Sequence, residues 1–217
     1  MAPRKAARTR GPRAPRTTTA PRPRGADGRR IEILRAAAAA FRRHGYHGAS
    51  TEAIADTLGM RKSHLYYYFR NKEEILYVLH DWSADLLLER LSEVQAREEP
   101  VAGKLQALVR SFVRMIIDEL HGTALTLDLE PLGPAALRRV VEKRDRFERG
   151  VRALVEQGMA AGELAPGSAK LKTFALLGAV NWISRWYDPR GPASSEEVGT
   201  AFADVLLGGL LVRPKEL

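Results

Sequence analysis

Apolar residues recur at spacings of three and four along most of the chain. This spacing places side chains on one face of an α-helix. The first such stripe lies in residues 29–44 and consists of Ile31, Leu34, Ala38 and Phe41. Gly45 follows directly, and a glycine suits the end of a helix because left-handed backbone costs it little. The pattern predicts a helix over 29–44.

Two shorter helical segments follow, joined at a glycine. The hydroxyl of Ser50 or Thr51 can cap the first of them, and Ile54, Ala55 and Leu58 then share one face. The second segment resumes at about residue 61 after the corner at Gly59. It turns Leu65 and Phe69 inward and leaves Arg61, Lys62, Ser63, His64 and Tyr67 outward. This is the layout of a helix-turn-helix, which offers the first residues of its second helix to base edges.

The remaining pattern is helical as well. Asn71 and Glu74 form a capping-box arrangement, and the helix they open is expected to reach about Arg97, before Pro100. Further helices are expected over 101–120, about 123–130, 134–159, 169–187 and, after a second capping box in Ser194–Glu197, to about Leu210. No segment alternates as a strand does. We therefore predict an all-α fold with a three-helix head (29–80) and a body of five to six helices (81–217).

The net charge of +9 is concentrated at the N-terminal end. Residues 1–28 hold eight Lys or Arg against one acid, residues 29–80 nine against five, and residues 81–217 eighteen against twenty. A polyanionic partner is therefore expected for the first two segments only. Residues 1–28 are rich in Arg and Pro, which predicts a disordered basic arm. Such an arm raises DNA affinity with little sequence information, or serves only as a solubilising tail.

Several kinds of site are not expected. The chain has no cysteine, which leaves no disulfide, thiolate metal site or cysteine nucleophile. His44 and His47 are three apart but have no third ligand nearby, so we expect no metal. There is no apolar run of roughly 20 residues, and the N-terminus does not resemble a secretory signal. We expect a cytoplasmic protein that is not an enzyme and needs no cofactor, since no catalytic motif stands out.

The polar tip of the helix-turn-helix supplies the candidate DNA contacts. Lysine reaches guanine acceptors and serine pairs with either kind of base edge, while Thr51 near a helix N-terminus can hold a phosphate. Tyr66 and Lys72 are candidate phosphate neighbours. The alternative for the tyrosines is that they pack the head's core, which we expect for Tyr68. The candidate DNA-binding residues are Thr51, Arg61, Lys62, Ser63, His64, Tyr66, Tyr67 and Lys72.

Residues 29–80 resemble the DNA-binding domain of the TetR family of bacterial repressors. The resemblance is carried by Ile31–His44 with Gly45 and Gly48, then Ser50-Thr51, Ile54-Ala55, Leu58-Gly59, Leu65–Phe69 and Lys72–Ile75. Met60 departs from it, since a small β-branched residue is usual there. Arg61, Ser63 and His64 lie where such proteins vary their base readers, so the operator sequence is not implied.

The segment Asn181–Pro189 resembles the junction of helices eight and nine in TetR-type regulators of fatty-acid and sterol breakdown, several of which respond to acyl-CoA thioesters. An apolar cavity would take the acyl chain, while a cation and aromatic rings suit the nucleotide. The alternative is that Trp182 and Trp186 fill the helical core or a subunit interface. The candidate ligand-binding residues are Phe112, Met115, Ile116, Phe147, Val151, Phe174, Leu177, Trp182, Arg185 and Trp186.

We therefore expect a ligand-responsive repressor that binds a palindromic operator as a homodimer. Two-fold symmetry would supply a second half-site about one duplex turn away, roughly 34 Å, and the last two long helices would form the interface. A small apolar effector, with an acyl-CoA thioester as the candidate, would bias the helix over about 72–97. The alternatives are an effector-free architectural DNA-binding protein and an acyl-thioester enzyme.

Overall fold

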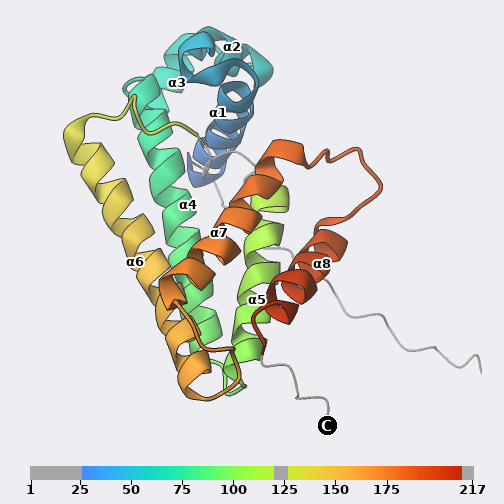
Figure 1. The fold of residues 1–217 in the computed structure, drawn as a ribbon. Coiled ribbons are helices and arrows are strands. Elements are labelled where there is room, and N and C mark those ends of the chain that lie inside the picture. The colour runs from blue at the N-terminus through green and yellow to red at the C-terminus, as the bar shows by residue number, and fades with distance from the viewer. Residues whose placement is uncertain (1–25, 120–126, 212–217) are drawn as a thin grey trace, which may run out of the picture.

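A computed structural model of the chain describes residues 26–119 and 127–211. These residues form eight α-helices and one π-helical segment, so the predicted all-α fold is confirmed (Figure 1). The elements are α1 (Ala26–Gly48), α2 (Thr51–Thr57), α3 (Lys62–Tyr68), α4 (Lys72–Gln95), α5 (Val101–Arg114), η1 (Met115–Glu119), α6 (Pro134–Ala160), α7 (Ala169–Trp186) and α8 (Ser195–Gly208).

Helices α1, α2 and α3 form a small head at one end of the molecule (Figure 1). Its core is fully covered and contains Ile33, Phe41, Ile54, Leu65 and Phe69, all at most 1% exposed. Gly59 adopts φ +60° at the corner between α2 and α3, a conformation that other residues adopt only with strain. The inward side chains and the glycine corner expected from the sequence are both confirmed.

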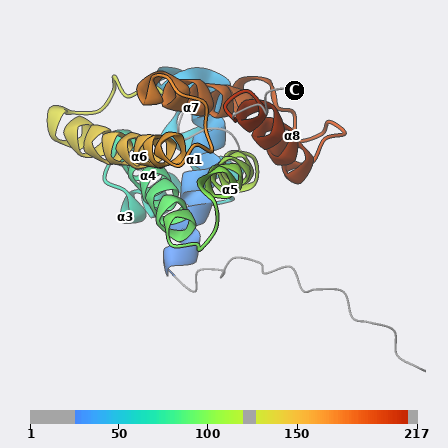
Figure 2. The same ribbon diagram turned by 60° about the horizontal axis from the view of Figure 1, so that its bottom comes forward.

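Helix α4 leaves the head and continues into the body, where α5 and α6 lie beside it (Figure 1). In the body, α4 packs on α6 and α5 packs on α8, while α7 contacts both α5 and α6. Seen from the body end, these helices surround a shared interior (Figure 2). Their packing buries side chains from each, including Leu87, Leu105, Phe147, Val180 and Leu207. One continuous helix, α4, therefore runs through both the head and the body core.

Polar caps begin most of the body helices. The side chain of Asn71 accepts from the N–H of Glu74 at 2.7 Å, and Ser168 and Ser194 cap α7 and α8 in the same way. The box at Ser194 and Glu197 is complete, as predicted. At Asn71 only half of it forms, because the Glu74 carboxylate accepts from the N–H of Arg70 at 2.6 Å instead. The capping box predicted at the start of α4 is therefore wrong in one of its two hydrogen bonds, the one from the N–H of Asn71 to Glu74.

Other expected helix boundaries shift modestly. Helix α1 begins at Ala26, three residues earlier than expected, and Gly45 breaks its geometry at φ +70°. The helix expected over 101–120 becomes π-helical from Met115, and this wider turn buries three successive residues, Met115, Ile116 and Ile117. Of the short helix expected over 123–130, residues 127–130 are not helical, and the rest lies outside the described residues. Residues 1–25 of the predicted basic arm also lie outside them.

No helix in the described ranges combines the length and the apolar character that crossing a bilayer requires. The same residues contain no group of three or more histidines and acids placed to hold a metal ion.

Candidate DNA-reading head and effector cavity

The N-terminal end of α3 presents polar side chains to solvent. Arg61, the N-cap residue, together with Lys62, Ser63 and His64, is exposed, and Tyr67 is 83% exposed. Leu65 and Phe69 anchor the opposite face of this helix in the head's core. The helix is thus held from behind while the side chains of its N-terminal end face outward, which is the geometry for entering a major groove.

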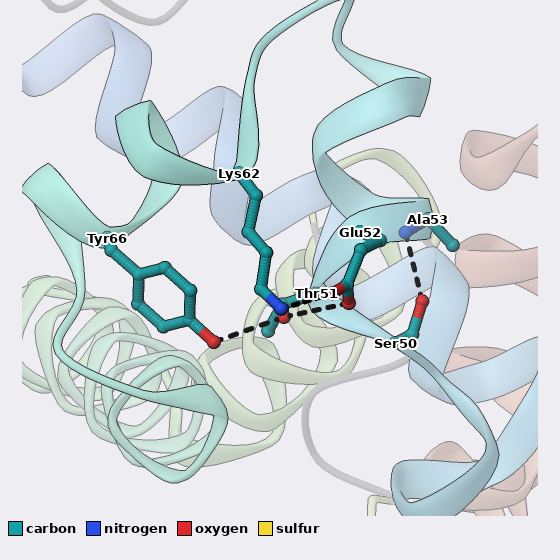
Figure 3. A network of polar contacts seen from close by, with 6 residues as sticks. All are labelled: Ser50, Thr51, Glu52, Ala53, Lys62 and Tyr66. Carbon is teal, nitrogen blue, oxygen red and sulfur yellow. Dashed lines mark hydrogen bonds and ion pairs between the residues drawn. The ribbon is translucent and has the colours of Figure 1, made fainter.

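A network of polar contacts joins α2 to α3 (Figure 3). The side chain of Ser50 accepts from the N–H of Ala53 at 3.0 Å and caps α2. The hydroxyls of Thr51 and Tyr66 lie 3.3 Å apart, and Glu52 pairs with Lys62. Thr51 is only 7% exposed, whereas Tyr66 is 41% exposed, so this contact leaves part of the Tyr66 ring on the surface of the head. These contacts fix the angle between the two helices.

The Glu52–Lys62 pair changes the acid–base behaviour of both groups. The hydrogen bond from Lys62 lowers the pKa of the Glu52 carboxyl, and the same contact raises the pKa of the Lys62 ammonium. Both shifts favour the charged form of the group concerned. Sequence reasoning missed Glu52, because its partner lies ten residues away on another helix and no local pattern links the two.

Lys72 is placed differently from the other candidates. Its ammonium donates to the carbonyl oxygens of Tyr46 at 2.8 Å and Ala49 at 3.0 Å, and it lies 4.4 Å from the centre of the Tyr46 ring. These acceptors are backbone groups that follow the break at Gly45, at and just beyond the C-terminal end of α1. The observed contacts of Lys72 are therefore within the protein, where it fastens α4 to the head.

Two arginines that sequence reasoning also missed stabilise the head. Arg29 donates to the carbonyl oxygen of Leu58 at 3.0 Å, which ties α1 to the corner before Gly59. The guanidinium of Arg30 lies 4.8 Å from the centre of the Phe69 ring. A basic residue in this head is therefore not by itself a DNA contact.

The body contains a cavity of about 220 Å³ between α4, α5, α6 and α7. Its apolar lining comes from each of these helices: Ala84, Leu87, Phe112, Phe147 and Leu177. Arg144, Asp145, Glu148 and Asn181 add polar groups. Phe112 and Phe147 meet edge to face, with ring centres 5.7 Å apart. An apolar hollow with a few converging polar groups is the usual form of a small-molecule site.

The polar side of this cavity is linked to α4. Arg144 lies 3.1 Å from Nδ1 of His80, a residue of α4 that is 1% exposed, and burial lowers the pKa of the Arg144 guanidinium. The neighbouring Lys143 bridges Asp81 at 2.6 Å and Asp85 at 2.7 Å. The polar wall of the cavity is therefore in contact with α4, the helix that carries the head.

Comparison with known families fits both parts of this geometry. The family described as "Bacterial regulatory proteins, tetR family" matches residues 33–78, and "Tetracyclin repressor-like, C-terminal domain" matches residues 98–210. The chain belongs to the TetR family of transcriptional regulators. TetR-type repression, rather than an enzymatic reaction, is therefore its class of function.

Individual TetR relatives resemble the chain over most of its length. It is 28% identical to the HTH-type transcriptional repressor KstR2 of Mycolicibacterium smegmatis, over 84% of this chain and 90% of the relative. The structure of the TetR regulator PfmR from Thermus thermophilus superposes with a TM-score of 0.73 at 30% identity, covering 81% and 97% of the two chains. The structure of AibR in complex with isovaleryl coenzyme A and operator DNA superposes with a TM-score of 0.70 at 26% identity, covering 84% of this chain and 98% of AibR.

Within this TetR fold, the predicted ligand residues separate into several groups. Phe112, Phe147 and Leu177 line the cavity of about 220 Å³, whereas Met115, Ile116 and Val151 are buried in the core and do not line it. Phe174, Trp182 and Trp186 are 49%, 64% and 49% exposed on α7. Arg185 lines a second cavity of about 390 Å³ between α7 and the end of α1.

Several polar residues of this TetR body were not among the predicted ligand-binding residues. Arg144, Glu148 and Asn181 form the polar side of the cavity of about 220 Å³, and His80 links Arg144 to α4, although His80 and Arg144 are 64 residues apart. A charged residue on a long helix is more often on a wet face, so nothing in the local pattern marked Arg144 as a partly buried residue.

Proposed function

We propose that this TetR-type repressor binds a palindromic operator as a homodimer and is released by a small acyl-CoA thioester bound in the body. The observation that carries the effector half is the cavity of about 220 Å³, which is apolar on most sides and reaches α4. The DNA half rests on the exposed polar tip of α3, with Arg61, Lys62, Ser63, His64 and Tyr67 as base or phosphate contacts and Tyr66 beside them.

The second copy in the dimer would cover α7 and α8. Leu171, Phe174, Trp182 and Trp186 lie at spacings of three, eight and four on α7 and so form one stripe, and Val205 on α8 is 75% exposed. Exposed apolar side chains of this size on two consecutive helices are typical of a subunit interface. Of the two alternatives for the tryptophans, this placement favours the interface over the core.

The size of the cavity limits the effector. Pockets for drug-sized ligands span about 300–1,000 Å³, so about 220 Å³ suits a short acyl chain better than a sterol-sized group. The nucleotide part needs cations, and Arg185 lines the larger cavity together with Arg42 and His47. The AibR structure, which holds isovaleryl coenzyme A and operator DNA, supports a short acyl-CoA for this chain by similarity. The cavity favours an effector-responsive repressor over the effector-free alternative.

Coupling would run through α4. Ala84 and Leu87 of α4 line the cavity, and Lys72 at its first turn is fastened to the end of α1. An effector that fits the cavity only when α4 shifts would move the two heads away from successive grooves. A difference of a few kcal/mol in affinity for the two arrangements is enough for release.

The effector experiment has two stages. Thermal stability is measured with isovaleryl-, octanoyl- and lauroyl-CoA and with free CoA, and operator binding is then measured with each compound that stabilises the protein. The operator is selected from a random duplex library. We expect a short-chain thioester to raise Tm and release DNA, and free CoA to do neither. No stabilisation by any thioester would defeat the effector proposal while leaving DNA binding intact.

A cavity-filling variant locates the site. Leu177→Trp should retain operator binding but lose release by the thioester, because the larger ring occupies the cavity. Val141→Trp, on a partly exposed position of α6 that does not line the cavity, is the matched control and should respond as the wild type does. Equal loss of response in both variants would contradict the assignment of the cavity.

The dimer is tested by mass in solution. Trp182→Glu should shift the protein from dimer to monomer in sedimentation and abolish tight operator binding, because a single α3 reads too few base pairs. Val141→Glu replaces another exposed apolar residue, on α6, and should remain dimeric. A wild-type protein that is monomeric at micromolar concentration would contradict the proposal.

A further inference from the structure

The first residue of α3 is already paired with an acid before any DNA is present. The ammonium of Lys62 contacts the carboxylate of Glu52 across the corner of the helix-turn-helix (Figure 3). The two side chains are 46% and 55% exposed, so the pair lies on the surface that α3 presents to a groove. Exposed pairs of this kind contribute little to folding, and stability alone does not explain the pair's position.

The surroundings of the pair hold Lys62 in one direction. Its ammonium lies 5.8 Å from the centre of the Tyr66 ring. The Tyr66 hydroxyl is 3.3 Å from that of Thr51, and the Thr51 hydroxyl donates to Glu52 at 3.4 Å. Glu52 thus belongs to a closed network on two helices, with Lys62 at its outer edge.

This pairing has opposite consequences on random DNA and on an operator. Sequence-independent binding comes from cations that displace counterions from phosphates, with a salt slope of about 0.9 per phosphate neutralised. A lysine held by a carboxylate gains little from a phosphate, and the carboxylate repels it. A guanine edge offers two acceptors at a fixed place in the groove, so it can replace Glu52 where the sequence is right.

We propose that Glu52 is a specificity-determining residue that positions Lys62 and withholds its charge from phosphates on non-operator DNA. The proposal rests on α3 entering the major groove, as proposed above. It assigns a role in discrimination to an acidic residue of a basic head, where the charge of Glu52 lowers total affinity but raises the ratio of specific to non-specific binding.

The test is Glu52→Gln, which keeps the shape and removes the charge. Binding to the selected operator and to a random duplex is measured at salt concentrations between about 50 and 200 mM. On random DNA we expect the slope of log affinity against log salt concentration to steepen by about 0.9, which changes the affinity ratio across this range by about threefold. We also expect binding at the lowest salt concentration to tighten by at least about threefold. Operator affinity should gain less, so the specificity ratio falls. A double variant, Glu52→Gln with Lys62→Gln, should lose the steeper slope.

Asp56→Asn is the matched control. Asp56 is an exposed acid on the same helix as Glu52, and it has no ion pair among the described residues. An unchanged slope in Glu52→Gln, or an equal change in Asp56→Asn, would overturn the proposal. The proposal would also be overturned if Glu52→Gln lost the preference for one base pair of the operator while its binding to random DNA stayed the same. In that case Glu52 would contact a base itself. If Lys62→Gln alone leaves operator binding unaltered, the placement of α3 fails instead.

Discussion

The ammonium of Lys72 donates a hydrogen bond to the carbonyl oxygen of Tyr46 at 2.8 Å, and so joins the first turn of α4 to the end of α1. A second bond from the same ammonium reaches Ala49 at 3.0 Å. Helix α4 also carries Glu73, whose carboxylate accepts from the N–H of Gly133 at 2.8 Å, directly before α6. The first turn of α4 is therefore the point where head and body are fastened together.

Lys72→Met tests this fastening. The variant leaves two carbonyl acceptors without their charged donor, so we expect the free energy of unfolding to fall by about 1–3 kcal/mol. Urea unfolding followed by circular dichroism measures it. Arg43→Met removes an exposed cation from α1 and should change stability by less than about 0.5 kcal/mol. A variant of normal stability whose DNA salt slope falls by about 0.9 would instead identify Lys72 as a phosphate contact.

His64→Ala and Tyr67→Ala test the reading surface of α3. Both side chains are exposed, and Tyr67 is 83% so, so stability should change by less than about 0.5 kcal/mol. If these side chains contact bases, each variant should weaken the free energy of operator binding by about 1–3 kcal/mol and change binding to random DNA little. Fluorescence anisotropy with operator and random duplexes measures both. Equal loss on every sequence would show that the base readers lie elsewhere.

Gly158→Ala tests the contact between α6 and the loop that follows it. An added Cβ would lie 2.8 Å from Cδ1 and 2.9 Å from Cγ of Leu164, a residue that is 1% exposed, and 3.2 Å from Val101. Overpacking of this kind costs about 1–3 kcal/mol, against a helix-propensity gain of about 1 kcal/mol. We expect a net loss of up to about 2 kcal/mol.

Gly208→Ala is the control for this substitution, because an added Cβ would meet nothing within 4 Å at that position of α8. It should raise the free energy of unfolding by up to about 1 kcal/mol. If both alanine variants stabilise the protein, Leu164 does not press on Gly158.

The capping box of α8 predicts a pH dependence. Hydrogen bonds from the backbone and side chain of Ser194 lower the pKa of the Glu197 carboxyl. A lowered folded-state pKa contributes stability above the unfolded value of about 4.3, and this stability is lost as pH falls through the folded value. Glu197→Gln should therefore be less stable than the wild type at about pH 6, and the difference should narrow by about pH 3.5.

Urea unfolding at the two pH values measures this narrowing. Glu196→Gln, next to the box but outside it, should show no such narrowing. A constant difference between Glu197→Gln and wild type would mean that packing, not ionisation, accounts for the effect.

Local pattern in the sequence was enough for most of the fold. Period-three-and-four spacing identified every described α-helix, since each buries one face, and Gly59, Asn71 and Ser194 marked ends because their chemistry is local. The π-helical segment from Met115 was not predicted, because its apolar spacing is indistinguishable from that of an ordinary helix. The resemblance of the head to the TetR family rests on the same local signals, so residues 29–80 were enough to recognise it.

The sequence by itself therefore determined the all-α fold, the corner at Gly59 and the outward tip of α3. Only the tertiary structure decided which charged side chains already contact other groups of the protein. Lys72 donates to the Tyr46 carbonyl, Lys62 pairs with Glu52, and Arg144 lies beside His80. The reason is physical. Helix periodicity depends on neighbours three and four residues away, whereas these polar contacts join residues 10 to 64 positions apart, and only packing brings such residues together.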